Sequence, residues 1–309
     1  MRHFTAKGTK SLAMRRLRVT NDTRLLDFLL ATAGAKRTAA KQWLKVGAVG
    51  VNGSAVRQFD HPLKPGDEVT IGAVQATVAA QQLQHADIRI LFENDSLIAV
   101  DKPAGLLTVA TDSDKADTLF MRLNSYLRGR DGSRAARAAV VHRIDQGTSG
   151  VVLFAKSPEV RDQLQSEWPT VEKLYLAIVE RQPVEEQGTL ISYLTESKAL
   201  KVHSSLHARA GAKLATTRYR VLGTYERWSL LEVQIDTGRK HQIRVQLADL
   251  GHPVAGDRQY GAKTNPCERL ALHASSLRFN DPASGIELTI RSPFPSVMAR
   301  LFPASKRGT

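Results

Sequence analysis

The chain has 309 residues, of which 42% are hydrophobic and 24% are charged, and this composition excludes a disordered chain. The length accommodates one large domain together with a small one. Lys and Arg number 44 against 30 Asp and Glu, giving a formal net charge of +14. Such an excess indicates a polyanionic partner, most often nucleic acid, although a basic protein without that partner has the same composition. The single cysteine, Cys267, excludes an intrachain disulfide and fits a reducing compartment.

Residues 1–16 carry several basic side chains and no acid, and we expect them to form a flexible basic arm, with or without a role in binding. This segment has no continuous apolar core, so it is not read as a secretory signal. No stretch of the chain reaches the roughly 20 apolar residues that a membrane helix needs. The sequence therefore predicts a soluble, cytoplasmic protein without a membrane partner.

Two short helices are predicted next. The segment "NDTRLLDFLLATAG", residues 21–34, has polar capping residues, then an apolar run, then a glycine stop. The segment "KRTAAKQWLKVGAV" predicts a second helix that ends at Gly47. Arg37, Lys41 and Lys45 stand four residues apart and share one face of it. Like charges at this spacing repel, so a phosphate backbone is one explanation for them and a solvated face is the other.

Strands with tight turns follow these helices. "VGVNG" predicts a strand ending in an Asn52–Gly53 turn, and "FDHPLKPGDEVTIG" predicts a loop and a strand with a Pro65–Gly66 turn. The two helices, the "VNG" turn and the "LKPGDEV" strand make residues 17–72 similar to the S-four-like RNA-binding domain, named for a small-subunit ribosomal protein. Residues 73–87 are small and polar, and are predicted to be a linker.

From residue 88 onward, short β-type runs dominate. They read "IRILFE", "SLIAVDK", "GVVLFAK", "KLYLAIVE", "TRYRVLGTYE", "WSLLEVQI" and "IELTIR". Strands outnumber helices without strict alternation, so the predicted fold class of residues 88–309 is α+β, with a mixed or antiparallel sheet.

The stretch "VHRIDQGTSGVVLFAKS", Val141–Ser157, is the first candidate for chemistry. "GVVLFA" is an unbroken apolar run, typical of a buried central strand, and the glycine-rich "DQGTSG" before it is a turn. Asp145 is thus expected at the rim of a core strand, where a cleft can open. The alternative is a turn aspartate that caps backbone amides.

Two further segments supply possible partners. "HQIRVQLADLG" predicts a short helix with Ile243, Leu247 and Leu250 on its apolar face. Arg244 on this helix is either an ordinary surface residue or a cation that pairs with a buried carboxylate and keeps it ionised. Tyr175, within "EKLYLAIVE", is either a core residue or a ring on which a base stacks.

These motifs resemble the RluA-type RNA pseudouridine synthases. The resemblance is carried by "HRIDQGTSGVVLFAKS", "KLYLAIV", "TGRKHQIRVQLADLGHPVAGDRQYG", "RLALHASSLRF" and "AVDKPAGLLT", and covers about residues 88–300. It implies an isomerase that detaches uracil from its ribose, turns it within the site and rejoins it through carbon. It further implies that Asp145 is the catalytic carboxylate, as nucleophile or as general base, that Arg244 pairs with Asp145, and that Tyr175 contacts the uracil. Arg143 would fill the space left by the extruded nucleotide, and no metal or other cofactor is implied.

Other residues are candidates for binding the substrate. His142 adjoins Arg143 in the same motif, and Lys240 stands where the family more often has a neutral threonine. Residues 110–140 include an arginine-rich segment, read as a loop, whose Arg128, Arg130, Arg134 and Arg137 either contact phosphates or are solvated.

Three other functional classes share single features with this sequence. "HRID" also occurs in protein kinase catalytic loops, but a glycine-rich phosphate loop and a DFG triplet are missing where a kinase needs them. No nucleophile elbow supports a hydrolase. A non-catalytic RNA-binding or ribosome-assembly protein remains the main alternative. We expect a monomer without an obligatory protein partner that acts on RNA, with large-subunit ribosomal RNA favoured over transfer RNA.

Overall fold

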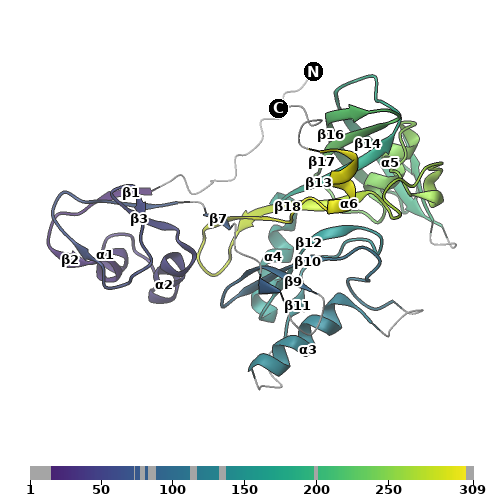
Figure 1. The fold of residues 1–309 in the computed structure, drawn as a ribbon. Helices are drawn as coiled ribbons and strands as arrows, with labels where there is room; N and C mark the ends of the chain where they lie inside the picture. The colour runs from purple at the N-terminus through teal and green to yellow at the C-terminus, as the bar shows by residue number, and fades with distance from the viewer. Residues whose placement is uncertain are drawn as a thin grey trace. The chain divides into compact units, whose positions relative to one another are not determined.

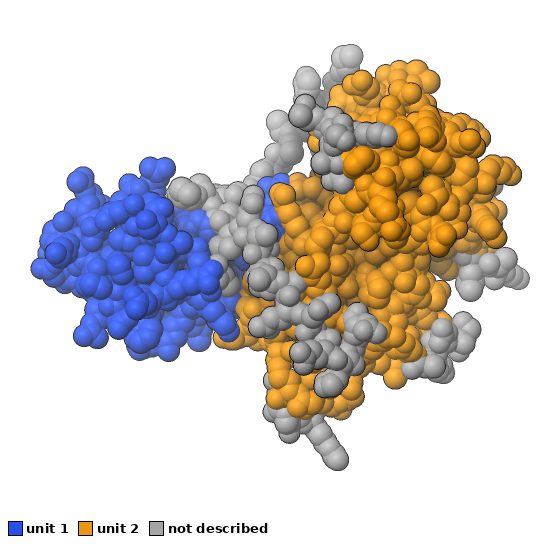
Figure 2. All heavy atoms as spheres, viewed as in Figure 1, with its two compact units in different colours: residues 1–77, 278–289 blue, residues 78–277, 290–309 orange. Residues whose placement is uncertain are grey.

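A computed structural model of the protein describes residues 15–72, 74–76, 81–82, 88–111, 117–131, 137–197 and 201–303. The chain divides into two compact units, coloured separately in Figure 2. Unit 1 comprises residues 1–77 and 278–289, and unit 2 comprises residues 78–277 and 290–309. In the described parts of the chain, no helix combines the length and the apolar content that a membrane crossing requires.

Unit 1 contains two helices and short antiparallel strands (Figure 1). Its elements are β1 (Arg15–Arg18), β2 (Thr23–Arg24), α1 (Leu25–Ala31), α2 (Arg37–Val46), β3 (Val49–Val51), β4 (Ser54–Ala55), β5 (Pro62–Leu63), β6 (Glu68–Ile71) and β7 (Val74–Ala76). One sheet has the order β1-β6-β3-β4, and β2 pairs with β5. The apolar side of α1 is fully packed, and it consists of Leu25, Leu26, Phe28 and Leu29.

The helices of unit 1 form in the predicted order, with one difference in length. α2 ends at Gly47, which has a left-handed φ of 75°, as the sequence predicts. α1 is shorter than the predicted segment 21–34, because Thr23 and Arg24 pair as a strand and Arg24 makes no side-chain cap. Of the predicted arm, residues 1–14 lie outside the described residues, whereas residues 15–16 belong to β1.

The division into units also differs from a simple N-terminal and C-terminal split. The first boundary falls in the predicted linker, of which the structure describes only β7 and β8 (Gln81–Gln82), both short strands. The segment 278–289 groups with unit 1, which the sequence does not predict. Trp43 of α2 donates its indole N–H to the carbonyl of Ser284 over 2.9 Å, and this bond links the segment to α2.

Unit 2 is built on a mixed sheet, as predicted (Figure 1). Its main path is β15-β14-β16-β17-β13-β18-β12-β10-β9-β8. The strands are β9 (Arg89–Glu93), β10 (Leu97–Lys102), β11 (Ala139–Val140), β12 (Ser149–Ala155), β13 (Glu172–Glu180), β14 (Gln187–Glu196), β15 (Val202–Ser205), β16 (Lys213–Tyr225), β17 (Trp228–Ile235), β18 (Leu272–Asn280) and β19 (Glu287–Arg291). Residues 278–280 of β18 and 287–289 of β19 belong to unit 1. The sequence did not predict β14, β15 or β18 as strands.

The helices of unit 2 pack on this sheet. They are α3 (Leu119–Asp131), α4 (Pro158–Glu167), α5 (Gln242–Asp249) and α6 (Ser296–Leu301). Leu119, Leu123 and Leu127 of α3 pack against the apolar side chains of β9, β10 and β12. The prediction that Arg128 and Arg130 lie in a loop is therefore wrong, because these buried leucines make their segment the last turns of a helix.

The central strand β12 is buried at every position, as its apolar run predicts. It runs antiparallel to β10 and parallel to β18. The pairing places Gly150 opposite Ala274. The turn that precedes β12 carries Asp145, and it therefore lies at one end of the most deeply packed part of the sheet.

Candidate active site

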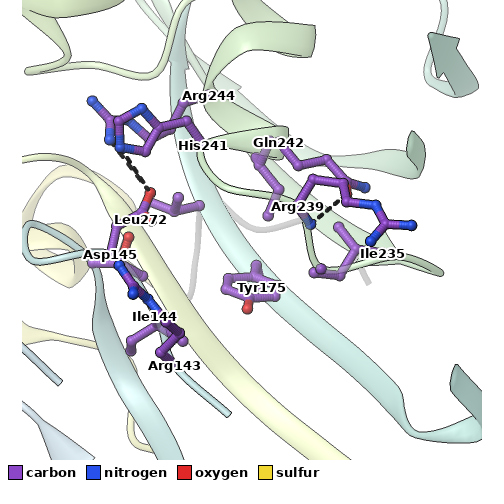
Figure 3. Close-up of a pocket in the computed structure, with 13 residues that line it drawn as sticks. Arg143, Ile144, Asp145, Tyr175, Ile235, Arg239, His241, Gln242, Arg244 and Leu272 are labelled. Carbon is purple, nitrogen blue, oxygen red and sulfur yellow. Dashed lines mark hydrogen bonds and ion pairs between the residues drawn. The ribbon is translucent and has the colours of Figure 1, made fainter. Parts of the chain in front are cut away.

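A pocket opens around Asp145 at the end of β12 (Figure 3). Its walls come from the turn 143–148, from Tyr175 on β13, from residues 235–244 between β17 and α5, and from Leu272 on β18. It contains about 410 Å³ of unfilled space, part of which is continuous with solvent. Ile144, Ile235 and Leu272 give it apolar walls around a small number of charged groups, the composition expected of a ligand site.

Asp145 pairs with Arg244 across this pocket. Arg244 Nη1 lies 3.3 Å from Asp145 Oδ2, joining residues 99 positions apart. This is the predicted partner, rather than the sequence neighbour Arg143. Among the described residues, no backbone amide donates to the Asp145 carboxylate, so the turn-capping alternative is not what the structure shows. The turn is instead closed by the main-chain carbonyl of Asp145, which accepts from Thr148 N–H over 3.1 Å.

The orientation of Arg244 is set by a second carboxylate. Arg244 Nε and Nη2 donate to the two oxygens of Asp257 over 2.6 and 3.0 Å, and Nη2 also donates to Gln259 Oε1 over 2.9 Å. Burial alone lowers the pKa of Arg244, but the hydrogen bond and charge of Asp257, with the charge of Asp145, raise that pKa above its usual value. The guanidinium is therefore a fixed cation, with Nη1 left to face Asp145.

Tyr175 lines the same pocket and lies opposite Val233 on β17. Its ring packs against both main apolar clusters of unit 2. Burial, and then the negative charge of Asp145, raise the pKa of the phenol, so the hydroxyl stays protonated at neutral pH. The ring therefore packs in the core and also forms a wall of the pocket, and the stacking of a base on it stays a prediction.

Arg143 is exposed and lines the pocket, and among the described residues no carboxylate pairs with it. His142, in contrast, is not a lining residue. Its Nε2 accepts the backbone N–H of Leu153 over 3.0 Å, and its ring stacks on Trp168 at 4.4 Å. Lys240 forms an ion pair with Glu196 outside the pocket.

The remaining predicted binding residues lie away from the pocket lining. Arg37, Lys41 and Lys45 are exposed on α2 of unit 1. Arg128 is exposed near the end of α3, and Arg130 forms an ion pair with Glu93 at 2.8 Å. Arg137 is exposed, and Arg134 lies outside the described residues.

Sequence reasoning missed several residues of the site. Arg239, His241 and Gln242 line the pocket, and Asp257 holds Arg244. All four occur in the quoted motif that begins at Thr237, but nothing in their local spacing indicates that they converge on Asp145. The one indication in the sequence is that many polar residues occur together in this short segment.

Lys102 does not line the pocket, but it supports the turn that carries Asp145. Its ammonium donates to the carbonyl oxygens of Pro103, Leu106 and Gln146 over 3.0, 2.6 and 3.0 Å. Burial lowers the pKa of Lys102 to about 7, yet three carbonyl acceptors match the three protons of the charged form. The side chain thereby ties the loop after β10 to the residue that follows Asp145. Among the described residues, no group of three or more His, Cys, Asp or Glu side chains is placed to hold a metal ion.

The chain matches known proteins over most of its length. Residues 96–249 match the family described as RNA pseudouridylate synthase. An uncharacterized RNA pseudouridine synthase of Bacillus subtilis, YlyB, is 33% identical over 283 residues, covering 90% of this chain and 92% of the relative. The ribosomal large subunit pseudouridine synthase D of Nitrosomonas europaea is 34% identical over 281 residues, covering 87% of this chain and 80% of the relative.

A solved structure agrees with these sequence relatives. The human RNA pseudouridylate synthase domain containing 4 superposes with a TM-score of 0.58 at 25% identity, covering 69% of this chain and 92% of that one. The fold, the motifs around the pocket and the extent of these matches lead to one conclusion: the chain belongs to the RluA-type RNA pseudouridine synthases, isomerases that act on RNA.

Proposed function

We propose that this enzyme converts uridines of large-subunit ribosomal RNA to pseudouridine, with Asp145 as the essential carboxylate. The observation that carries the proposal is the pairing of Asp145 with Arg244 inside a pocket that also contains Tyr175. A carboxylate at the rim of a core strand is reachable by a ligand, while Arg244 balances its charge.

The conversion of uridine to pseudouridine requires a carboxylate and a pocket of this kind. The bond between the ribose and uracil nitrogen 1 breaks, a bond between the ribose and uracil carbon 5 forms, and the proton on carbon 5 is replaced by one on nitrogen 1. Atoms and electrons balance without an oxidant or reductant. A carboxylate can attack as a nucleophile or move the proton. The base must first leave its stack, and contacts with Tyr175 and the apolar walls would offset that cost.

The same proposal assigns the exposed cations to RNA. Arg143 reaches the pocket without a carboxylate partner in the described residues, so it is available to occupy the place of the extruded nucleotide. In unit 1, Arg37, Lys41 and Lys45 lie exposed on one helix and would contact phosphates, as expected for an S-four-like domain. The relative from Nitrosomonas europaea is named a ribosomal large subunit pseudouridine synthase, which supports ribosomal RNA as the substrate.

The role of Asp145 is tested with Asp145→Asn and with Asp249→Asn as a matched control, since Asp249 is exposed at the end of α5. Tritium release from RNA labelled at carbon 5 of uridine measures the reaction. We expect no detectable release by Asp145→Asn, unchanged release by Asp249→Asn, and RNA affinity near that of the wild type for both. Release by Asp145→Asn at the wild-type rate would remove the carboxylate from the mechanism.

The substrate is tested by mapping pseudouridines in a strain that lacks the protein. We expect specific positions of large-subunit ribosomal RNA to revert to uridine and to be restored by the purified enzyme. Loss of positions in transfer RNA instead would redirect the substrate. If the purified wild-type protein rearranges no uridine in any cellular RNA, the non-catalytic RNA-binding alternative replaces this proposal.

A further inference from the structure

His241 has an unusual backbone conformation beside Asp145. Its φ and ψ are 53° and 17°, a left-handed conformation that residues other than glycine rarely adopt, and it immediately precedes α5. The next residue, Gln242, anchors the turn by donating to Thr216 O and Thr217 Oγ1 over 3.0 and 2.9 Å. The fold therefore holds His241 against its backbone preference, at the wall of the pocket.

A chain of hydrogen bonds determines which imidazole nitrogen carries the proton. The backbone N–H of Val202 donates to the hydroxyl oxygen of Tyr260 over 3.1 Å. Tyr260 Oη lies 2.8 Å from His241 Nδ1, and in the described part of the chain the hydroxyl proton has no other acceptor. Tyr260 therefore donates to Nδ1. A neutral imidazole that accepts at Nδ1 carries its proton on Nε2.

That Nε2 faces the carboxylate of Asp145. The distance from His241 Nε2 to Asp145 Oδ2 is 4.0 Å, and Arg244 Nη1 approaches the same oxygen at 3.3 Å. Burial, which is the main effect, lowers the pKa of His241, so the ring is neutral at neutral pH. Arg244 donates to Oδ2 and His241 Nε2 faces the same oxygen, so Oδ1 is the oxygen left to a ligand. The 4.0 Å gap is of the kind that closes when a substrate fills the site.

One short segment orients both donors. Asp257 and Gln259 hold the guanidinium of Arg244, and Tyr260, in the same 3-10 turn (η2, Arg258–Tyr260), holds the ring of His241. The Arg244 guanidinium carbon also lies 5.0 Å from the centre of the Tyr260 ring. The segment 257–260 therefore acts as one support for the whole environment of Asp145.

We propose that His241 is a positioning residue, which Tyr260 holds in the Nε2–H form so that this N–H orients the Asp145 carboxylate for reaction. This inference rests on the proposed role of Asp145. It adds a second donor to that of Arg244 and explains why a non-glycine residue occupies a left-handed position at the pocket.

Three substitutions test the arrangement. Asparagine suits the left-handed backbone, so His241→Asn should fold; its amide oxygen can still accept from Tyr260, but it has no group at the place of Nε2. The longer amide of His241→Gln restores a donor near that place. Tyr260→Phe keeps the ring against Arg244 and removes only the hydroxyl that selects the tautomer.

The kinetic readout is the single-turnover rate of tritium release, measured with excess enzyme on RNA from a strain that lacks the protein, beside the RNA dissociation constant. We expect His241→Asn to slow the reaction about 10- to 100-fold, because the loss of one hydrogen bond to a charged group changes a rate by about this factor. RNA affinity should stay within about 3-fold, since one rim residue adds little to total binding. His241→Gln should recover part of the rate.

The outcomes separate this inference from the proposed function. If His241→Asn reacts at the wild-type rate while Asp145→Asn is inactive, the inference is overturned and the proposed function stands. If Asp145→Asn is active, both fail. Equal losses of rate and of RNA affinity in His241→Asn, without recovery in His241→Gln, would show a merely structural role and overturn the inference.

Nitrogen NMR of labelled histidine gives a readout that does not depend on activity. The chain has nine histidines, and the signal lost in His241→Asn identifies this one. We expect wild-type His241 to be neutral, with Nε2 protonated and Nδ1 unprotonated, and to shift toward a mixture of tautomers in Tyr260→Phe. A proton on Nδ1 in the wild type would overturn the inference.

Discussion

Single residues show how similar side chains take different roles according to their neighbours. His142 precedes Asp145 by three residues in the chain and His241 lies beside Asp145 in the fold, but only His241 of the two lines the pocket. The ring of His142 is used to accept a backbone N–H of β12. Burial, and then the charge of Lys173, lower the pKa of His142 to about 3, so it is neutral in the folded protein. Its expected role in binding RNA is thereby replaced, in our proposal, by support of the central strand.

This neutral histidine predicts a pH dependence of stability. In the unfolded chain the His142 pKa is near 6.5, so below that pH the unfolded state binds more protons and the free energy of unfolding falls as pH falls toward 3. The amide oxygen of His142→Gln can accept from Leu153 but does not titrate in this range. Between pH 7 and pH 5 we therefore expect the free energy of unfolding to fall by up to roughly 2 kcal/mol more in the wild type than in His142→Gln. Urea unfolding at both pH values measures this. His203→Gln, at an exposed position, is the control and should behave as the wild type.

Among the elements, β12 is where the chain packs most closely. Gly150 has a φ of 116°, and a Cβ placed there would lie 2.1 Å from the carbonyl oxygen of Ala274 on β18. Two backbones therefore meet at this point without room for a side chain, next to the turn that carries Asp145. The glycine of "TSG" is explained by this approach of two backbones, whereas Thr148 in the same part of the motif lines the pocket.

The contact predicts a large loss of stability for Gly150→Ala. The added methyl must push β12 and β18 apart, which we expect to cost about 3 kcal/mol, the upper end of the usual range for overpacked sites. Gly211→Ala is the matched control, because Gly211 also has a left-handed φ, 77°, but open space where the methyl would lie. That control should cost only about 1 kcal/mol of backbone strain. Similar unfolding midpoints for the two variants would contradict the close approach.

At the scale of the whole molecule, the relevant feature is the distribution of charge along the chain. The net charge of +14 is not spread evenly, because no acidic residue occurs between Phe28 and Phe59. Within unit 1, α2 carries Arg37, Lys41 and Lys45 in exposed positions. In unit 2, by contrast, several exposed arginines form ion pairs, as Arg218 does with Asp236 and Arg220 with Glu232. Unit 1 therefore presents a group of exposed cations on one helix, and the residues that line the Asp145 pocket belong to unit 2.

Replacing Arg37, Lys41 and Lys45 together with alanine should weaken RNA binding and reduce its dependence on salt. Each lost phosphate contact lowers the slope of log affinity against log salt concentration by about 0.7 to 0.9. The matched control replaces the exposed Lys201, Arg209 and Lys213, which removes the same net charge from unit 2. Titrations at several salt concentrations measure both. Equal slopes for the two variants would show that total charge, and not the α2 face, governs affinity.

Much of the fold could be predicted locally. Apolar runs indicated β9, β10, β12, β13 and β17, and a glycine indicated the end of α2, because these features depend on residues next to one another. Predictions were less accurate where packing overrides the local pattern. Leu250 was expected on the apolar face of α5, but the helix ends at Asp249 and this side chain is 38% exposed.

The sequence by itself determined the fold class, the family and the position of Asp145 at the mouth of a buried strand, since each follows from ordered motifs and local hydrophobic patterning. Only the tertiary structure decided which groups surround that carboxylate. The order of strands in the sheet brings together residues as far apart as Asp145 and Arg244, 99 positions away in the chain. Asp257 and Tyr260 then orient Arg244 and His241, through contacts that depend on the path of the backbone and have no signature in the spacing of the residues.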